Sequence, residues 1–284
     1  MSRLGKSVGS SPAAVPPSVE ADVVRRLRAA GCVFAEEEAH LLIQGADTPQ
    51  ALAAVVEQRV AGLPLEHVLG WVDFCGLRLV VDRGVFVPRR RTELLVRRAA
   101  ARCASGATIV DLGCGCGAVG RAIAALVWPV TVYAVDIEPA AVECARGNLR
   151  SIGGRVYVGD LYQPLPAGLR GTVDVLVANV PYVPTGALGL MPAEARVHEP
   201  LSALDGGPDG LDVLRRVATQ APSWLAPGGH LLVEIGHDQS AAALAAVNGA
   251  GLAATVEHDA DHGGTVVVGR ADGRPQSALI SPVS

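Results

Sequence analysis

TIVDLGCGCGA, residues 108–118, is the stretch of this chain that decides its fold. Apolar residues lead to Asp111, and three glycines then follow in Gly-x-Gly-x-Gly spacing. Glycines at this pitch let the backbone turn sharply and approach a ligand closely, and a helix that follows points its first amides at the bound group. The stretch therefore predicts a strand, a ligand-binding loop and a helix.

Two further apolar segments end in a carboxylate. Residues 132–136, VYAVD, place Asp136 where a ribose diol would donate hydrogen bonds to it. Residues 156–160, VYVGD, bring Asp160 to a position where it could meet an adenine amino group. Together with the glycine loop, these segments predict a nucleoside-binding α/β fold. The residues expected to contact the nucleoside ligand are Asp111, Gly113, Cys114, Gly115, Cys116, Gly117, Asp136, Ile137, Asp160, Leu161 and Asn179.

The spacing of the glycines bears on the identity of the cofactor. The dinucleotide fingerprint is Gly-x-Gly-x-x-Gly, whereas residues 113–117 read GCGCG, so no pyrophosphate is implied. The loop favours S-adenosylmethionine, whose ammonium group prefers carboxylates and carbonyls, over a nicotinamide dinucleotide, which stays as a distant alternative. Cys114 and Cys116 form a C-x-C, but structural zinc normally uses a longer C-x(2–4)-C spacing. We therefore expect no metal.

A tetrapeptide after the apolar residues 173–178 predicts the acceptor site. It reads Asn179-Val180-Pro181-Tyr182. An asparagine, a backbone carbonyl held by proline and a tyrosine together make a small site for a planar NH2 group. The same tetrapeptide is also ordinary strand-to-turn chemistry, so its weight comes from the glycine loop upstream. Asn179, Pro181 and Tyr182 are the expected catalytic residues.

Composition limits the classes of protein. The chain has 284 residues, of which 50% are hydrophobic, with a net charge of −4 and a pI near 6.0. These values predict a globular protein and give no bulk reason to expect nucleic-acid binding. No segment approaches the roughly 18 uninterrupted apolar residues that a membrane helix needs. The six cysteines lack a framework spacing and the start of the chain lacks a secretory layout, so we expect a reduced, cytoplasmic setting.

The pattern along the chain predicts a small helical module followed by a larger α/β domain. Apolar residues recur at helical spacing between Val19 and Val68, and residues 74–81 alternate before a break at 82–84, which indicates a β-hairpin. Seven strands interleaved with helices predict a doubly wound sheet, with strands near 108–112, 131–135, 155–158, 173–178, 230–235, 252–257 and 264–269. The expected parts are a flexible segment at 1–17, a helical domain at 18–72, a hairpin and connecting helix at 73–106, the α/β domain at 107–270 and a flexible tail at 271–284.

Six segments, in this order, make the chain similar to the HemK/PrmC-type protein-glutamine methyltransferases. They are residues 87–96 (VPRRRTELLV), 111–118, 135–136, 179–182, 199–211 (EPLSALDGGPDGL) and 234–236 (EIG). The family usually reads Asn-Pro-Pro-Tyr and Pro-Arg-Pro-x-Thr-Glu, so Val180 and Arg90 replace prolines here. Replacing the first proline frees one φ angle, while Pro181 still shapes the turn.

The resemblance implies a fold, an activity and a partner. The fold would be a class I S-adenosylmethionine-dependent methyltransferase sheet with a helical N-terminal domain that recognises the protein substrate. The activity would be methylation of a glutamine side-chain amide in a class I peptide chain release factor. The residues implied for substrate binding are Asn179, Val180, Pro181, Tyr182, Glu199 and Pro200. For Glu199 and Pro200, lining the substrate mouth and merely fixing a loop are both open.

The expected chemistry depends on how the acceptor nitrogen is oriented toward the methyl group of the cofactor. If Asn179 and the carbonyl of Val180 or Pro181 each accept one NH2 hydrogen, the nitrogen points at the methyl carbon. Tyr182 would pack against the amide or the sulfonium and exclude water. Two alternatives remain: a nucleobase acceptor, because Asn-x-Pro-Tyr also occurs in adenine-N6 methyltransferases, and a non-catalytic module that only binds the cofactor. The acidity of the chain argues against the first, and Val180 is the only support for the second.

Overall fold

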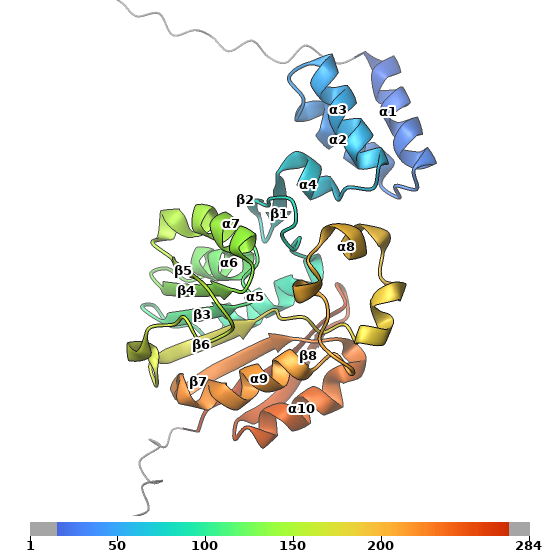
Figure 1. Cartoon of the computed structure of the whole chain (residues 1–284). Helices are drawn as coiled ribbons and strands as arrows, with labels where there is room; N and C mark the ends of the chain where they lie inside the picture. The colour runs from blue at the N-terminus through green and yellow to red at the C-terminus, as the bar shows by residue number, and fades with distance from the viewer. Residues whose placement is uncertain (1–15, 273–284) are drawn as a thin grey trace, which may run out of the picture. The chain divides into compact units, whose positions relative to one another are not determined.

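The computed structural model describes residues 16–272, and the chain divides between Leu69 and Gly70 into two units (Figure 1). The predictions of flexible ends at 1–17 and 271–284 lie almost wholly outside the described residues. Pro17, at the border, is already the first residue of a helix. Ala271 donates its backbone N–H to the carbonyl of Gly229 at 2.9 Å.

The smaller unit consists of helices α1 (Pro17–Ala29), α2 (Ala35–Gln44), α3 (Pro49–Val60) and α4 (Leu65–Leu69). Local chemistry sets the start of α3, because Thr48 accepts a hydrogen bond from Ala51 N at 3.1 Å and Pro49 occupies the first turn. Leu27 and Leu42 are fully buried in the core of the unit. Arg59 Nε donates to the buried Glu38 at 2.6 Å, so this buried carboxylate has a cationic partner.

A β-hairpin opens the larger unit. Strands β1 (Trp71–Phe74) and β2 (Leu77–Val80) are antiparallel, with Phe74 opposite Leu77. The turn lies at Cys75 and Gly76, whose φ angles are 50° and 72°, as a two-residue hairpin turn requires. The break seen in the sequence at 82–84 therefore follows the hairpin and is not its turn.

The larger unit is built on a seven-stranded sheet in the order β5-β4-β3-β6-β7-β9-β8. Strands β3 to β7 are parallel to their neighbours, and β9 is antiparallel to both β7 and β8. The bounds of the strands are β3 (Thr108–Leu112), β4 (Thr131–Asp136), β5 (Arg155–Val158), β6 (Val173–Ala178), β7 (Leu225–Glu234), β8 (Ala253–Asp259) and β9 (Gly264–Arg270). The predicted doubly wound α/β sheet is confirmed.

Helices cover both faces of this sheet (Figure 1). One face packs against α5 (Glu93–Ala100), α6 (Ala118–Leu126) and α7 (Pro139–Leu149), and the other against α9 (Asp212–Gln220) and α10 (Ser240–Gly249). Because side chains alternate along a strand, Ile109 of β3 joins the first core and Val110 joins the second. The order of the strands reverses direction at β3 and β6, which is where ligands bind in open α/β sheets.

Two details differ from the sequence-based expectation. No helix separates β8 from β9, because only residues 260–263 connect them and the two strands form a hairpin. Strand β7 begins at Leu225, five residues before its expected start, and its pairing with β6 shifts register between Val173 and Val175. Within residues 16–272, no helix has the length and apolar character that crossing a membrane would require.

Candidate active site

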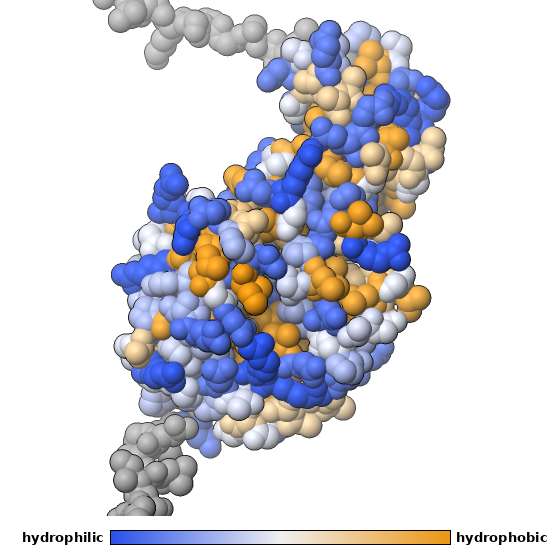
Figure 2. Space-filling model, viewed as in Figure 1, coloured by the Kyte–Doolittle hydropathy of each residue, from blue (hydrophilic) through white to orange (hydrophobic). Residues whose placement is uncertain are grey.

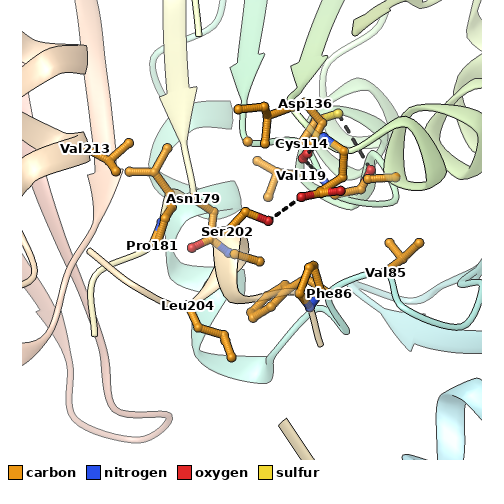
Figure 3. A pocket seen from close by; sticks show the side chains of 18 of the residues that line it. Val85, Phe86, Cys114, Val119, Asp136, Asn179, Pro181, Ser202, Leu204 and Val213 are labelled. Atoms are coloured by element: carbon orange, nitrogen blue, oxygen red, sulfur yellow. Dashed lines mark hydrogen bonds between the residues drawn. The ribbon is translucent and has the colours of Figure 1, made fainter. Parts of the chain in front are cut away.

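A cavity opens at the carboxyl ends of β3, β4 and β6, inside the larger unit (Figure 3). The loop after each of these three strands contributes to its wall, as do the segment before α5 and the segment between β6 and α9. The sequence-predicted residues that line it are Gly113, Cys114, Gly115, Cys116, Asp136, Ile137, Asp160, Leu161, Asn179, Val180, Pro181, Tyr182 and Pro200. Three of the predicted residues are not in its wall: Asp111, Gly117 and Glu199.

The glycine loop approaches the Asn-Val-Pro-Tyr turn closely. Gly113 has a φ of 64°, and a Cβ built there would lie 3.1 Å from the carbonyl oxygen of Asn179 and 3.3 Å from Val180 Cγ1. Both the left-handed backbone and the lack of space require glycine at this position. The close approach places the two sequence motifs against each other, so that one cavity includes both.

An asparagine that the sequence analysis did not single out fixes the same loop. Asn148, in α7, donates to the carbonyl of Cys116 at 2.8 Å and to that of Val80 at 2.8 Å, and accepts from Val80 N at 3.0 Å. The side chain therefore ties the glycine loop to strand β2. Cys116 is 1% exposed, so its role in the wall is that of a small packed residue.

Asp136 lies at the end of β4 and lines the cavity. Its two carboxylate oxygens accept hydrogen bonds from Gly115 N at 2.8 Å and from Glu138 N at 2.9 Å. Burial raises the pKa of the carboxyl, and the two backbone donors oppose that rise. Asp136 thus joins the glycine loop to the turn before α7, and half of Ile137 beside it is exposed.

Asp111 differs from the sequence-based expectation. Its side chain lies on the face of the sheet that α6 covers, as the alternation after Ile109 requires, and it is fully buried. Oδ2 accepts from Gly120 N at 2.9 Å, while Oδ1 has no hydrogen-bond partner among the described residues. Burial raises the pKa of this carboxyl to about 7, and the neighbouring charge of Asp136 adds to the rise. Asp111 braces the first turn of α6 instead of forming part of the cavity wall.

The third predicted acid is paired. Asp160 lines the cavity at the end of β5, and its carboxylate bonds to the guanidinium of Arg216 from α9. Leu161, the next residue, is buried with a φ of 51°, a conformation rarely adopted by a leucine. Both residues line the same cavity as the Asn-Val-Pro-Tyr turn.

The turn after β6 presents its polar groups to the cavity. Val180 is buried against Gly113, whereas Asn179 and Pro181 are partly exposed. The side chain of Asn179 makes no hydrogen bond to any residue within the described range 16–272. An amide that is half-buried in a cavity wall, and has no protein partner, leaves its oxygen open to an NH2 donor.

Tyr182 belongs to a network that the sequence did not predict. Its hydroxyl donates to Glu234 Oε1 at 3.1 Å, and Arg91 Nε donates to the same oxygen at 3.2 Å. The guanidinium of Arg91 also lies 5.6 Å from the centre of the Tyr182 ring. Burial, and then the charge of Glu234, raise the pKa of the tyrosine, so it stays protonated. The only sequence signals for Arg91 and Glu234 were the family segments 87–96 and 234–236 in which they lie.

Glu199 lies outside the cavity wall, where it braces the segment before α5. Its side chain is fully buried, bonds to the guanidinium of Arg89 and accepts from Val87 N at 3.3 Å. Pro200, by contrast, lines the cavity. Next to it, Ser202 donates to Glu138 Oε1 at 2.5 Å, so the segment after Glu199 reaches the residues that follow Asp136 (Figure 3).

The chain is similar to a family of methyltransferases and to several named proteins. The methyltransferase small domain family matches residues 76–208. A release factor glutamine methyltransferase of Moorella thermoacetica is 40% identical over 243 residues, which are 78% of this chain and 85% of the relative. Proteins of the same name from Geobacter sulfurreducens and Mycolicibacterium smegmatis are 39% and 41% identical, each over 69% of this chain and 70% of the relative.

Solved structures give the same fold. A 16S rRNA N2 methyltransferase of T. thermophilus, in complex with AdoMet and guanosine, is similar with a TM-score of 0.50 and 18% identity, over 71% of this chain and 49% of that one. At this identity the likeness shows the fold alone.

Proposed function

This chain belongs to the family of release factor glutamine methyltransferases, and on that premise we propose that it methylates the side-chain amide nitrogen of a glutamine in a class I peptide chain release factor. The cofactor is S-adenosylmethionine, which supplies a methyl group bound to a positively charged sulfur. The observation that carries the proposal is Asn179, whose side chain lines the cavity without a partner among residues 16–272.

The residues of the cavity suit this cofactor. Gly115 leaves room beside the backbone of the loop, since a Cβ there would find nothing nearer than 3.9 Å. Asp136 would bind the ribose diol, and Ile137 and Leu161 would pack on the adenine. Asp136, in the cavity wall, bonds only to backbone amides and has no cationic partner among residues 16–272, which favours a ligand that carries an ammonium and a sulfonium.

On the acceptor side the residues of the turn have separate tasks. Asn179 Oδ1 and the carbonyl of Val180 or Pro181 would each accept one hydrogen of the glutamine NH2, so that the nitrogen lone pair points at the carbon to be transferred. Tyr182 would close one side of the site against water. Because its hydroxyl is bonded to Glu234, the ring has a fixed orientation. No group has to remove a proton before transfer, since the product nitrogen loses it afterwards.

The surface near the cavity suits a protein acceptor. Ile137, Leu190, Val197 and Leu201 are 53%, 87%, 64% and 61% exposed, and the last three lie in the segment between β6 and α9. Apolar side chains gather in the middle of the larger unit on the face that Figure 2 shows, with hydrophilic ones around them. Exposed apolar residues favour a peptide segment over a nucleic acid, whose backbone requires cations.

We assign recognition of the release factor to the helical unit, described by itself. Val33 and Phe34 between α1 and α2 are 84% and 66% exposed, which is unusual for such side chains without a partner. If they contact the substrate, Phe34→Ala will raise KM for the release factor at least about threefold and leave kcat unchanged. An unchanged KM would remove the assignment.

We also assign the reaction to the cytoplasm, because all six cysteines are free thiols.

A direct assay tests the proposed function. The purified protein is incubated with methyl-labelled S-adenosylmethionine and a bacterial class I release factor, and the label is mapped by mass spectrometry. We expect one methyl group on a glutamine side chain, and none with Asn179→Ala. Asn248→Ala is the matched control, because Asn248 lies in α10, accepts from Ala254 N at 3.0 Å and does not line the cavity. Label on duplex DNA, or no label while calorimetry shows cofactor binding, would overturn the proposal.

A further inference from the structure

Tyr182 is held at its backbone as well as at its hydroxyl. The side chain of Gln239, five residues after the end of β7 at Glu234, donates from Nε2 to the carbonyl of Tyr182 at 2.8 Å. Its Oε1 accepts from Gly236 N at 2.8 Å, so the same side chain closes the turn that follows Glu234. One short segment therefore supplies both the acceptor for the tyrosine hydroxyl and the donor for the tyrosine carbonyl.

The glycine-rich loop 206–210 completes this support. Gln239 Nε2 also donates to the carbonyl of Asp209 at 3.0 Å. A Cβ on Gly210 would overlap the carbonyl of Tyr182 and the amide of Gln239, and one on Gly206 would lie 2.7 Å from the carbonyl of Pro181. Only glycine lets this loop pack backbone to backbone against the turn. The sequence DGGPDG matched a family segment but had no assigned role until this contact explained it.

Hydrogen bonds extend the contact beyond the turn. Val183 N donates to the carbonyl of Leu204 at 3.1 Å, and Gly206 N donates back to the carbonyl of Val183 at 2.9 Å. Residue 183 is thus paired with residue 205 as in a parallel bridge. The residues immediately after the Asn-Val-Pro-Tyr turn are fixed on one side by this loop and on the other by Gln239.

We infer that Gln239 is a positioning residue: with Glu234 it holds Tyr182 at both ends, and with the loop 206–210 it fixes the direction of the carbonyls beside Asn179. The inference rests on the proposed function, because it assigns a task in aiming the acceptor amide. Its physical reason is that Val180 and Tyr182 have free φ angles, so the turn needs external donors to keep one conformation. Gln239 does not touch the substrate and removes no proton.

Two substitutions separate the parts of this role. Gln239→Glu keeps an acceptor for Gly236 N but removes the donor to Tyr182 and Asp209, whereas Gln239→Leu removes all three bonds. Asn248→Ala is the control, since it removes a side-chain bond to a backbone amide away from the site. The measurements are kcat and KM with the release factor, binding of S-adenosylhomocysteine by calorimetry, and amide hydrogen exchange of peptides that cover 179–183 and 111–118.

We expect both Gln239 variants to lower kcat roughly tenfold to thirtyfold, with KM and product binding within about twofold of wild type. Exchange should become faster in 179–183 and stay unchanged in 111–118. If kcat and exchange of 179–183 equal those of wild type, or if Asn248→Ala has the same effect, the inference is wrong. If Gln239→Leu fails to fold, Gln239→Glu carries the test. If the wild-type enzyme transfers no methyl group, the proposed function fails, while the exchange data still decide whether Gln239 holds the turn.

Discussion

Asp111 and Asp136, on the cofactor side of the site, bond only to backbone amides, and no arginine, lysine or histidine within residues 16–272 pairs with them. Glu199 and Glu234, on the acceptor side, are each paired with an arginine from the segment 89–91. All four carboxylates are largely buried or, for Asp136, held in the cavity wall. Carboxylates therefore lie in opposite electrostatic surroundings on the two sides of the site: without a cationic partner on the cofactor side, and paired with an arginine on the acceptor side.

The difference corresponds to the charges of the two ligands. A cofactor with a sulfonium and an ammonium gains from carboxylates that have no other counter-ion. A neutral glutamine amide is not attracted by net charge. On its side of the cavity the carboxylates are neutralised by arginines, and they orient Tyr182 and the segment before α5. Asp160 is the exception on the cofactor side, but its pair with Arg216 lies at a partly exposed position. The comparison teaches that one half of the cavity binds by charge and the other half acts by orientation.

Removing the orienting amide should have the largest effect. Asn179→Ala should lower kcat by about 1,000-fold, because the turn loses the side-chain acceptor that aims the nitrogen, while binding of S-adenosylhomocysteine stays within about twofold. Steady-state kinetics and calorimetry on the same preparation measure the two values. If binding of S-adenosylhomocysteine weakens along with kcat, Asn179 does not act on the acceptor side alone, and the division between the two sides of the cavity is wrong.

The second-largest effect should come from the cofactor side. Asp136→Asn removes the charge and one acceptor that holds Gly115, and we expect cofactor binding to weaken by about 100-fold. The binding constant for S-adenosylmethionine, measured by calorimetry at constant ionic strength, reports it. A variant that binds normally but turns over slowly would show that Asp136 belongs with the orienting residues.

The lack of a cationic partner for Asp111 should make the free energy of unfolding depend on pH. Its pKa is about 7 in the folded chain and near 3.9 in the unfolded chain, so the folded state holds an extra proton between these values. Wild-type stability should therefore fall as pH rises from 4 to 7, and Asp111→Asn should escape that loss. Relative to wild type, the free energy of unfolding of the variant should rise by about 2 kcal/mol between pH 5 and pH 8.

Urea denaturation at the two pH values measures this difference. Asp174→Asn is the control, because Asp174 also accepts from a backbone amide, Thr108 N at 2.8 Å, but from a half-buried position. The control reports what the loss of a carboxylate that accepts from a backbone amide does by itself. If the free energy of unfolding changes equally with pH in wild type and in Asp111→Asn, the pKa of Asp111 is not raised in the folded chain.

The smallest effect should come from the paired acids. Glu234→Gln keeps an oxygen for the Tyr182 hydroxyl but removes the charge that holds Arg91, and we expect kcat to fall about tenfold with cofactor binding unchanged. Tyr182→Phe, which removes the other half of the bond, should not add its full effect in the double variant, since both changes break one contact. Additive losses would indicate that the bond between Glu234 and Tyr182 does not orient the ring.

The sequence located the parts of the site that are local in the chain. The glycine loop, Asp136 and Asn179 follow directly from apolar strands, and parallel strands bring their carboxyl ends to one edge. The family resemblance supplied the activity, and the named relatives agree with it. The helices between 17 and 69 likewise followed from apolar spacing and from Pro49 at the start of α3.

The parts that failed depend on pairs far apart in the chain. Arg91 and Glu234 are 143 residues apart, and Tyr182 and Gln239 are 57 apart, so no local pattern could indicate that they touch. The position of Asp111 outside the cavity wall has another reason: a strand pattern shows that a carboxylate ends an apolar run, but not that α6 covers the face to which its side chain points. Glu199 pairs with Arg89, 110 residues away in the chain, which no local pattern indicates.

Single-turnover methyl transfer to a release factor, measured against cofactor concentration, tests the division of the cavity most directly. At saturating S-adenosylmethionine, Asp136→Asn should recover a rate within about threefold of wild type, whereas Asn179→Ala should stay about 1,000-fold slower at every concentration. Recovery of Asn179→Ala at high cofactor, or a slow Asp136→Asn enzyme at saturation, would contradict the account.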